Sequence, residues 1–534
     1  MKGVQVLVGP PGTGKTTRIA EMVCQEWKTR GGYGNPAIVT SLTRAAASEA
    51  AGRDMPIRRN CVGTMHSFAY RSLESPEIAE PRAGEFSKEF ARWQMDGKKA
   101  SIDEPGFARE TTSGGMKAYQ RVQELRARQI PRDKGAWSAV RSFDKAWEAW
   151  KKKNGLLDFT DLIEHALATA PEHPMRPAVI FADEAQDLSA LELALLRQWT
   201  VNGAEALCLV GDPLQALYQW RGAHPSMFEE VDKSRREILS QSYRVPVAVH
   251  RLACHWARRL LTRFDVSYQP REGDPGRVAF LDSSWRNPEG IVQWAEEKSQ
   301  QGTVMIQSPC AYQLAPVLSV LRDRAIAYSN PWRRKRGDWN PLHRSAKLLA
   351  LILPVTQEQR MWTAVELKSW IEPLASKSYL VRGAKSLADR MAEAQHKDEP
   401  VEFELLARIF QPDALDILYS SMDDPASLCA WWRRGLKSSV PESSVYAART
   451  VESHGLQALT EEPLIHVGTI HSFKGAEDDS VLVIPDLSRA GWQEYQYGGD
   501  GTDGVIRLGY VALTRAKREL WVARQASQMA MPIL

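Results

Sequence analysis

The sequence predicts an α/β protein with two parallel-sheet domains, each interrupted by a helical insertion. Short apolar runs alternate with helix-like stretches near the N-terminus, and a second series of such runs begins at residue 277. This alternation is typical of parallel sheets covered by helices on both faces. Two stretches, at about 70–153 and 341–460, contain no convincing strand and interrupt the two series.

The expected strands are short apolar segments, several of which end in glycine or aspartate. The first series is VQVLVG (4–9), PAIVTS (36–41), AVIFADE (178–184) and ALCLVGD (206–212). The second is RVAFL (277–281), TVMIQS (303–308), LIHVGTI (464–470), SVLVIPD (480–486) and ELWVAR (519–524).

The first interruption carries a clear helical stripe. Phe143, Trp147 and Trp150 fall at i, i+4 and i+7, and Gly155 follows as an expected C-cap. Such a stripe favours core packing over ligand binding. The second interruption has helical periodicity in RSAKLLALILPV and FELLARIFQPDALDILYSSM.

Composition sets limits on the function. A chain of 534 residues is too long for one hydrophobic core, and its net charge of +4 permits a polyanionic partner without requiring one. The six cysteines form no CxxC pair, which argues against a zinc or iron–sulfur site and favours reduced thiols. Because no apolar run reaches transmembrane length, we expect a cytoplasmic protein without membrane contact.

A phosphate-binding motif lies directly after the first expected strand. GPPGTGKTT (9–17) matches G-x-x-x-x-G-K-[ST] between a strand and a helix, which is the context that this motif requires. Lys15 is expected to reach the β- and γ-phosphates, and Thr16 to hold Mg²⁺. The expected nucleotide contacts are Gly9, Pro10, Pro11, Gly12, Thr13, Gly14, Lys15, Thr16 and Thr17.

A second acidic motif completes the expected chemistry. The apolar strand in VIFADEAQD (179–187) delivers Asp183 and Glu184 to the carboxyl end of a parallel sheet, where ligands bind in such folds. Asp183 suits Mg²⁺, and Glu184 suits a general base that orients and deprotonates water. Together the two motifs predict nucleoside triphosphate hydrolysis.

The segment GDPLQALYQWRGA (211–223) has an unusual composition for a loop. It holds Gln215, Tyr218, Trp220 and Arg221 within seven residues. A core segment would exclude the amide and the arginine, and a solvated loop would exclude the two rings. We therefore expect a loop that faces two ligands.

The ordered motifs resemble those of superfamily 1 DNA helicases of the UvrD/Rep/PcrA branch. Besides the three segments above, they are TSLTRAAA (40–47), GTMHSF (63–68), LDFTDLI (157–163), QSYR (241–244), TIHSFKGAED (469–478) and YVALTRAKREL (510–520). The resemblance implies two RecA-like P-loop domains, 1A and 2A, with helical insertions 1B and 2B. The expected ranges are 1–69 and 154–240 for 1A, 70–153 for 1B, 241–340 and 461–534 for 2A, and 341–460 for a reduced 2B.

The resemblance also assigns roles around ATP. Gln215 would sense the γ-phosphate, and Arg244 and Arg515 match the family's arginine fingers. Such a guanidinium contributes about 10³–10⁵ in rate. Tyr243 would stack on adenine and Glu477 would contact ribose. Lys15, Glu184, Gln215, Arg244 and Arg515 are therefore the expected catalytic residues, with ATP and Mg²⁺ as cofactors.

For DNA the resemblance implies contacts that do not read sequence. Thr64, His66, Thr469, His471 and Ser472 suit phosphate and sugar contacts. Tyr218 and Trp220 would lie near the single strand, and Trp220 would stack on a base, although domain packing is the alternative. Arg221 is expected to tie this loop to DEAQD (183–187), and WRRKR (332–336) is either a phosphate contact or a solvated face.

Some positions depart from the family pattern. Ser41 and Met65 stand where base-stacking aromatics are usual, which weakens expected stacking in the first domain. The first strand begins near Val4, leaving no room for the adenine-reading glutamine segment, so we expect relaxed nucleotide selectivity.

The sequence thus favours an ATP-dependent helicase that moves 3′→5′ on single-stranded DNA and unwinds duplexes. Its expected partners are single-stranded DNA, single-strand/duplex junctions and replication or repair proteins, and we expect a monomer in solution. The alternative is a DNA-stimulated translocase or protein-displacing regulator that unwinds little. No acidic, lysine-containing nuclease motif supports a helicase–nuclease.

Overall fold

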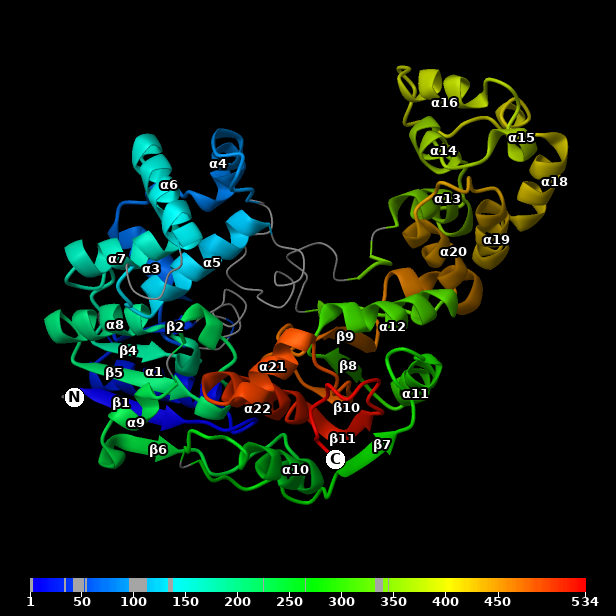
Figure 1. Cartoon of the computed structure of the whole chain (residues 1–534). Helices are drawn as coiled ribbons and strands as arrows, with labels where there is room; N and C mark the ends of the chain where they lie inside the picture. The colour runs from blue at the N-terminus through cyan, green and yellow to red at the C-terminus, as the bar shows by residue number, and fades with distance from the viewer. Residues whose placement is uncertain are drawn as a thin grey trace. The chain divides into compact units, whose positions relative to one another are not determined.

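The computed structural model describes residues 3–32, 35–41, 52, 55–95, 113–132, 138–223, 225–264, 266–331, 340–343 and 345–534, apart from the side chains of Trp220, Ser378 and Ser443 (Figure 1). The chain forms two compact units. Unit 1 holds residues 1–282, 307–312 and 469–534, and unit 2 holds residues 283–306 and 313–468. Each is described by itself.

The first sheet of unit 1 has six parallel strands in the order β3-β2-β4-β5-β1-β6. They are β1 (Val4–Val8), β2 (Ala37–Ser41), β3 (Val62–Thr64), β4 (Val179–Ala182), β5 (Ala206–Gly211) and β6 (Arg236–Ile238). Four were predicted, and β3 and β6 are short edge strands that the sequence did not reveal.

Helices cover both faces of this sheet, as its continuous apolar strands require. On one face α1 (Lys15–Thr29) packs through Ile19 and Val23. On the other face lie α3 (Met65–Ser72), α7 (Phe159–Thr169) and α8 (Ala190–Asn202). The carboxyl ends of β1, β4 and β5 therefore open onto the loops that carry the phosphate, acidic and glutamine motifs.

Between α3 and α7, the regular elements of the described residues are helices, and the only other pairing there is a single bridge between Ile78 and Leu157. The helices are η2 (Glu80–Arg82), α4 (Ala83–Glu89), α5 (Gly114–Ala127) and α6 (Ser138–Asn154). Phe143, Trp147 and Trp150 on α6 are all buried in one core with Phe86, so the core-packing prediction is confirmed. Gly155 has a positive φ of 66°, the left-handed conformation that ends a helix.

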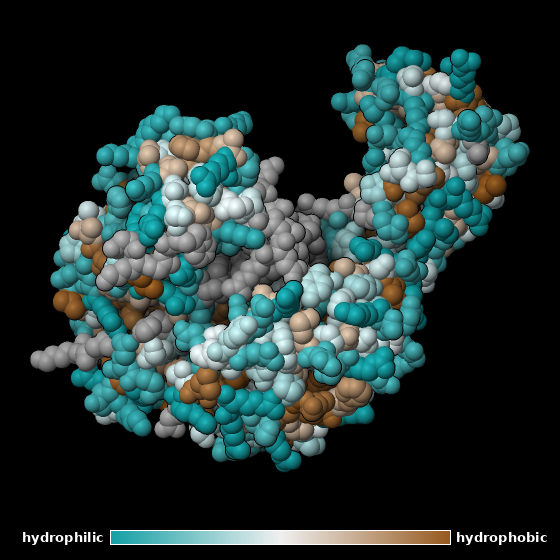
Figure 2. Space-filling view, in the orientation of Figure 1, coloured by the Kyte–Doolittle hydropathy of each residue, from teal (hydrophilic) through white to brown (hydrophobic). Residues whose placement is uncertain are grey.

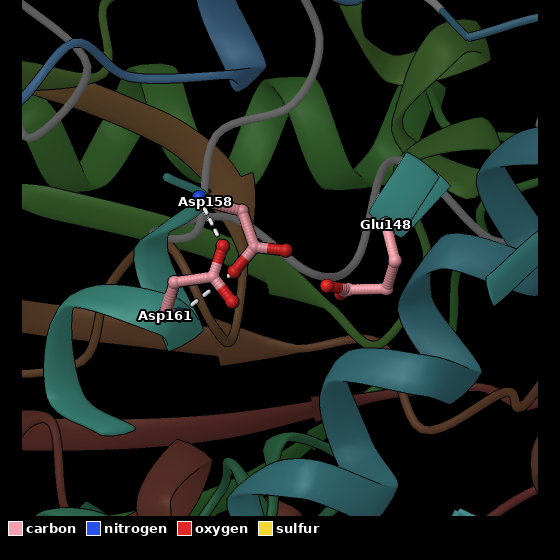
Figure 3. Close-up of side chains that lie close together, drawn as sticks. All are labelled: Glu148, Asp158 and Asp161. Atoms are coloured by element: carbon pink, nitrogen blue, oxygen red, sulfur yellow. Dashed lines mark hydrogen bonds between the residues drawn. The ribbon is translucent and has the colours of Figure 1, made fainter. Parts of the chain in front are cut away.

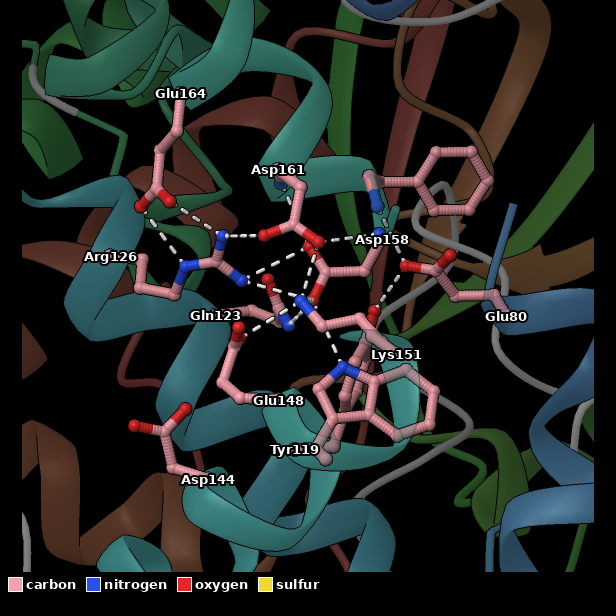
Figure 4. Close-up of polar contacts among 12 residues, drawn as sticks. Glu80, Tyr119, Gln123, Arg126, Asp144, Glu148, Lys151, Asp158, Asp161 and Glu164 are labelled. Carbon is pink, nitrogen blue, oxygen red and sulfur yellow. Dashed lines mark hydrogen bonds and ion pairs between the residues drawn. The ribbon is translucent and has the colours of Figure 1, made fainter. Parts of the chain in front are cut away.

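A group of charges, four of its six members buried, lies between α5, α6 and α7, and we call it the insertion charge cluster (Figure 4). Its members are Arg126, Lys151, Glu148, Asp158, Asp161 and Glu164. Arg126 Nη1 donates to Asp158 at 3.0 Å, and its other nitrogens reach Asp161 and Glu164. Asp158 also begins α7 as one half of a capping box with Asp161.

Three carboxylates of this cluster are spaced like metal ligands, since oxygens of Glu148, Asp158 and Asp161 are within 4.8 Å of one another (Figure 3). The ammonium of Lys151, however, lies 2.9, 2.7 and 2.5 Å from those three groups. Lys151 therefore supplies the positive charge that a metal cation would otherwise provide to these three carboxylates.

The second sheet has five strands in the order β7-β11-β10-β8-β9. They are β7 (Arg277–Leu281), β8 (Val304–Ser308), β9 (Ile465–Thr469), β10 (Asp478–Val483) and β11 (Ala516–Ala523), all predicted. In unit 1, α10 (Val247–Ala257) packs on α22 (Asp500–Leu513), and α21 (Arg489–Tyr497) precedes α22. The predicted α/β fold with two parallel sheets is confirmed.

Unit 2 is mainly helical. Its helices are α11 (Glu289–Ser299), most of α12 (Ala311–Asp323), α13 (Ala346–Thr356), α14 (Ala364–Ile371), α15 (Ser376–Tyr379), α16 (Ala384–Ala392), α17 (Phe403–Leu406), α18 (Pro412–Ser421), α19 (Pro425–Arg434) and α20 (Glu442–His454). Trp362, Trp370, Trp431 and Trp432 are fully buried among them. Figure 2 shows a largely hydrophilic face, and no helix among the described residues is long and apolar enough to cross a membrane.

Candidate nucleotide-binding site

The phosphate-binding loop joins β1 to α1. Gly12 and Gly14 have φ values of 71° and 79°, a conformation that other residues rarely adopt. Lys15 Nζ donates to the Gly9 carbonyl at 3.0 Å, and a Cβ on Gly9 would lie only 2.0 Å from Lys15 Cγ. The glycines are thus required for the lysine to fold back over the loop.

The segment QSYR (241–244) closes against this loop. Tyr243 N–H donates to the Gly12 carbonyl at 2.8 Å, and Ser242 Oγ donates to the Pro11 carbonyl at 2.7 Å. A Cβ on Gly12 would lie 2.2 Å from Arg244 Cβ. The ring of Tyr243 is 72% exposed, so it is free to stack on a planar ligand beside the loop.

The acidic motif stands at the end of β4. Glu184 has a positive φ of 52°, a strained conformation for a residue with a side chain. Its carboxylate lies 3.9 Å from Lys15 Nζ and 3.8 Å from Lys474 Nζ, and it accepts a hydrogen bond from Gln186. Burial alone would raise its pKa, but the two ammoniums hold the pKa at about 2. Glu184 is therefore ionised and suited to orienting water.

Asp183 and Thr16 offer the hard oxygen ligands that Mg²⁺ prefers. Asp183 is 4% exposed, and its Oδ1 accepts from the Glu184 N–H at 2.9 Å. The carboxylate is thus held rigidly at the carboxyl end of the sheet, which fits the predicted metal role.

Gln215 and Arg515 are in direct contact. Arg515 Nη2 donates to Gln215 Oε1 at 2.9 Å, and Gln215 Nε2 donates to Asp212 at 2.8 Å. Arg515 is 1% exposed, and burial together with nearby Arg244 lowers its pKa to about 9. The predicted phosphate sensor, Gln215, and the predicted arginine finger, Arg515, are thus hydrogen-bonded to one another.

The second predicted finger has a different partner. Arg244 Nε pairs with Glu477, the residue expected to contact ribose. The pair is half-buried, with side-chain exposures of 19% and 41%. Two predicted ATP contacts therefore neutralise one another here.

Lys474 is a further residue of the site, which lies within TIHSFKGAED (469–478) and for which no role was predicted. Its ammonium pairs with Asp187, donates to the Gln215 carbonyl at 3.0 Å and lies 5.1 Å from the Tyr218 ring centre. Its position two residues after Ser472 was the available signal. Lys474 joins the acidic motif to the loop at 211–223.

Other contacts hold this loop to DEAQD (183–187). Leu217 N–H donates to Asp187 at 3.1 Å, and Asp212 N–H donates to Gln186 Oε1 at 3.1 Å. The prediction that Arg221 makes this connection is wrong: among the described residues it pairs with none of the three acids, and its guanidinium lies 5.8 Å from the Tyr218 ring centre. Backbone donors replace the expected ion pair.

Helix α5 supports the far end of the loop, the turn η5 (Gln219–Arg221). Arg128 Nη2 donates to the Gln219 carbonyl at 2.9 Å. A Cβ on Gly222 would lie 3.0 Å from Ala127 Cβ, so the glycine permits this close approach. The backbone of this turn carries Trp220, whose side chain lies outside the described part of the structure.

The remaining predicted DNA contacts lie on two segments of unit 1. Thr64 caps α3, and His66 lies edge-on to Phe159 with Nδ1 3.8 Å from Glu192. Thr469 is buried at the end of β9 and accepts from Ser472 N–H. These DNA roles stay predictions.

Further predicted residues are buried or not described. Tyr218 is 4% exposed, and its ring centre lies 6.5 Å from that of His471. Met65 and Ser41 are buried too, so neither presents a surface to a base. WRRKR (332–336) lies outside the described residues.

Comparison with known proteins agrees with this arrangement. Residues 1–236 match the family model of the UvrD/REP helicase N-terminal domain. A protein of Mycoplasma pneumoniae described as a probable DNA helicase II homologue is 25% identical over 275 residues, 46% of this chain and 38% of that protein. Bacillus subtilis YjcD, described as a putative ATP-dependent DNA helicase, is 26% identical over 219 residues, 37% of this chain and 28% of that protein.

A shorter match covers 101 residues of one component of the ATP-dependent helicase/nuclease of Syntrophomonas wolfei, at 33% identity, with 18% of this chain and 8% of that protein. The matches thus span well under two thirds of these relatives. The chain is thus similar to UvrD/REP helicases over residues 1–236, and its two parallel sheets and ordered motifs agree with this similarity.

Proposed function

We propose that this protein is an ATP-dependent DNA helicase that moves 3′→5′ on single-stranded DNA and separates duplexes. One observation carries the proposal: Arg515, which follows α22, bonds Gln215, while Lys15 and Lys474 flank Glu184. This arrangement gathers the groups that phosphoryl transfer needs around one carboxylate.

The chemistry follows from the charges. Lys15 and Arg515 would stabilise the negative charge that develops on the γ-phosphoryl oxygens, and Glu184 would orient the attacking water. With a pKa of about 2, Glu184 stays ionised at neutral pH. Asp183 and Thr16 would hold Mg²⁺, which neutralises phosphate charge when bound.

Coupling to DNA would run through the loop at 211–223. Gln215 faces Arg515 at one end of the loop, and Trp220 belongs to the turn η5 at the other end, which α5 supports. Stacking on an aromatic ring is sequence-tolerant, which suits a motor that must release every base.

The first experiment measures ATP turnover with and without single-stranded DNA. We expect strong stimulation by single-stranded DNA, and Lys15→Ala should abolish turnover while preserving DNA binding. A turnover rate that single-stranded DNA leaves unchanged would contradict the motor. A wild-type protein that DNA stimulates, but that fails to separate any tailed duplex, would instead favour the translocase or regulator.

Polarity needs its own test. Duplexes with a 3′ or a 5′ single-stranded tail should be compared under identical ATP and Mg²⁺ concentrations. We expect strand separation with the 3′ tail alone. Preference for the 5′ tail would overturn the proposed direction but not the ATPase.

A further inference from the structure

Helix α22 and the residues that follow it carry a second fully buried arginine besides Arg515. Arg507 and Arg515 are each 1% exposed and lie eight residues apart, about two helical turns. Both reach the same short turn, η4 (Pro213–Gln215). Arg515 bonds the side chain of Gln215, and Arg507 Nε donates to the Pro213 carbonyl at 3.2 Å. One segment thus holds both ends of the turn.

This double attachment sets the orientation of Gln215. Asp212 accepts from Gln215 Nε2 at 2.8 Å, which leaves Oε1 for Arg515. The backbone on which the glutamine stands is anchored at the Pro213 carbonyl by Arg507. Loss of that anchor would let the turn shift without removing any group that contacts the nucleotide.

The charge of Arg507 is poorly compensated for a structural residue. Asp503 lies 3.7 Å away and also accepts from the N–H groups of Leu261 and Thr262. Among the described residues, Arg507 Nη1 has no hydrogen-bond partner. Burial lowers the pKa of this guanidinium. A buried charge of this kind adds little to the free energy of unfolding. We therefore attribute the role of Arg507 to the position in which it holds the Pro213 carbonyl.

We propose that Arg507 is a positioning residue that holds the Pro213–Gln215 turn for ATP hydrolysis, acting through Gln215 and not on the nucleotide. This inference rests on the proposed ATPase function. A shift of about 1 Å at a catalytic group costs on the order of 10² in rate. We therefore expect Arg507→Met to lower the kcat of DNA-stimulated turnover by about 10²-fold, with the KM for ATP unchanged.

Arg259→Met is the matched control. Like Arg507, Arg259 donates to a proline carbonyl, that of Pro532 at 2.8 Å. Arg259 lies over the ring of Trp256, as Arg507 lies over the ring of Phe264. This control should keep wild-type kcat. Arg507→Lys retains the charge but not the planar fork, so it should recover part of the loss. It also carries the comparison if Arg507→Met does not fold.

The sharpest test uses a Gln215→Ala background. If Arg507 acts through Gln215, adding Arg507→Met there should cause no further loss of kcat. An equal fold-loss in both backgrounds, or wild-type kcat for both Arg507 variants, would overturn the proposal. Should the wild type lack stimulation by DNA, the motor function fails, and the same comparison made on basal turnover still decides the role of Arg507.

Discussion

Two regions of unit 1 bury several charges, and they do so in opposite ways. In the insertion charge cluster, the cations Arg126 and Lys151 lie among Asp158, Asp161, Glu164 and Glu148, each within hydrogen-bond or ion-pair distance. In the nucleotide site, Lys15, Lys474, Arg244 and Arg515 face Glu184, Asp187 and Glu477. Both regions hold more carboxylates than cations, since Asp183 and Asp212 also belong to the second, but the cations are placed differently: Arg126 is ion-paired with three carboxylates, whereas Arg515 forms no ion pair among the described residues.

The two buried arginines show what this difference means. Burial alone would lower the pKa of Arg126, but the surrounding carboxylates raise it above its ordinary value. Burial and Arg244 lower the pKa of Arg515 to about 9. A buried guanidinium that carboxylates surround stabilises structure, whereas a buried guanidinium that lies near another one and pairs with no carboxylate is suited to an anionic ligand.

The largest expected effect is on turnover at Arg515. Arg515→Met should lower DNA-stimulated kcat by about 10³–10⁵-fold, because the guanidinium would stabilise the transition state. Thermal unfolding should change little, since the removed charge is under-compensated. Steady-state ATPase assays and calorimetry measure the two quantities. A large loss of stability with turnover preserved would reverse the comparison.

The converse is expected at Asp158. Asp158→Asn keeps the shape but removes the charge shared by Arg126 and Lys151, which should cost about 3–5 kcal/mol of unfolding free energy. Urea titration measures it. Glu89→Gln is the control, because Glu89 forms an exposed pair with Lys153 that should contribute little. Equal stabilities for the two variants would refute a structural role for the cluster.

A smaller effect is expected on DNA affinity. Trp220→Ala should weaken binding of single-stranded DNA by about 1–3 kcal/mol if its ring stacks on a base. Fluorescence anisotropy with a labelled oligonucleotide measures this. Tyr497→Ala is the control, because Tyr497 on α21 is 84% exposed but belongs to no predicted contact. Unchanged affinity for Trp220→Ala would favour the packing alternative.

A further effect concerns the pH dependence of stability and a neighbour of the insertion charge cluster. Glu80 Oε1 accepts from Tyr119 Oη and from Phe159 N–H, and burial, with Asp158 nearby, raises the pKa of Glu80 to about 8. The folded protein therefore holds a proton that the unfolded chain releases near pH 4.5, so stability should fall as pH rises from about 4.5 to 8.

Glu80→Gln keeps the acceptor oxygen and removes the titration. It should flatten the dependence of unfolding free energy on pH, as measured by urea titrations between about pH 6.5 and 8. Burial lowers the pKa of His173 from 6.5 to about 3, so His173 affects stability mainly below about pH 6.5, and it does so equally in the wild type and the variant. A variant as pH-dependent as the wild type would exclude Glu80 as the source.

The sequence predicted the parts of the fold that depend on local patterns. Nine apolar runs became strands, and the stripe of Phe143, Trp147 and Trp150 became core. It did not reveal β3 and β6, because three-residue edge strands carry too little periodicity.

The closeness of the candidate nucleotide-site residues could be predicted because motif spacing and a parallel sheet bring strand ends together, while their roles stay predictions. The insertion charge cluster was not. Arg126 and Lys151 belong to helices whose charged residues suggest solvent-exposed faces. The partners that bury Arg126 lie more than 30 residues away in the sequence, and those that bury Lys151 lie 7 to 10 residues away. Pairing at such separations is set by tertiary packing, which no local pattern encodes.

The contact between α5 and the turn at Gln219–Arg221 has a mechanical consequence. Arg126 anchors the last turn of α5 to α7 on the first sheet, and Arg128 extends from the same end to Gln219. Because α5 holds this turn, the turn cannot move independently of α5. If a DNA base is bound at Trp220, movement of that base would then shift the loop toward Gln215, and would not be lost in a local rearrangement of the turn.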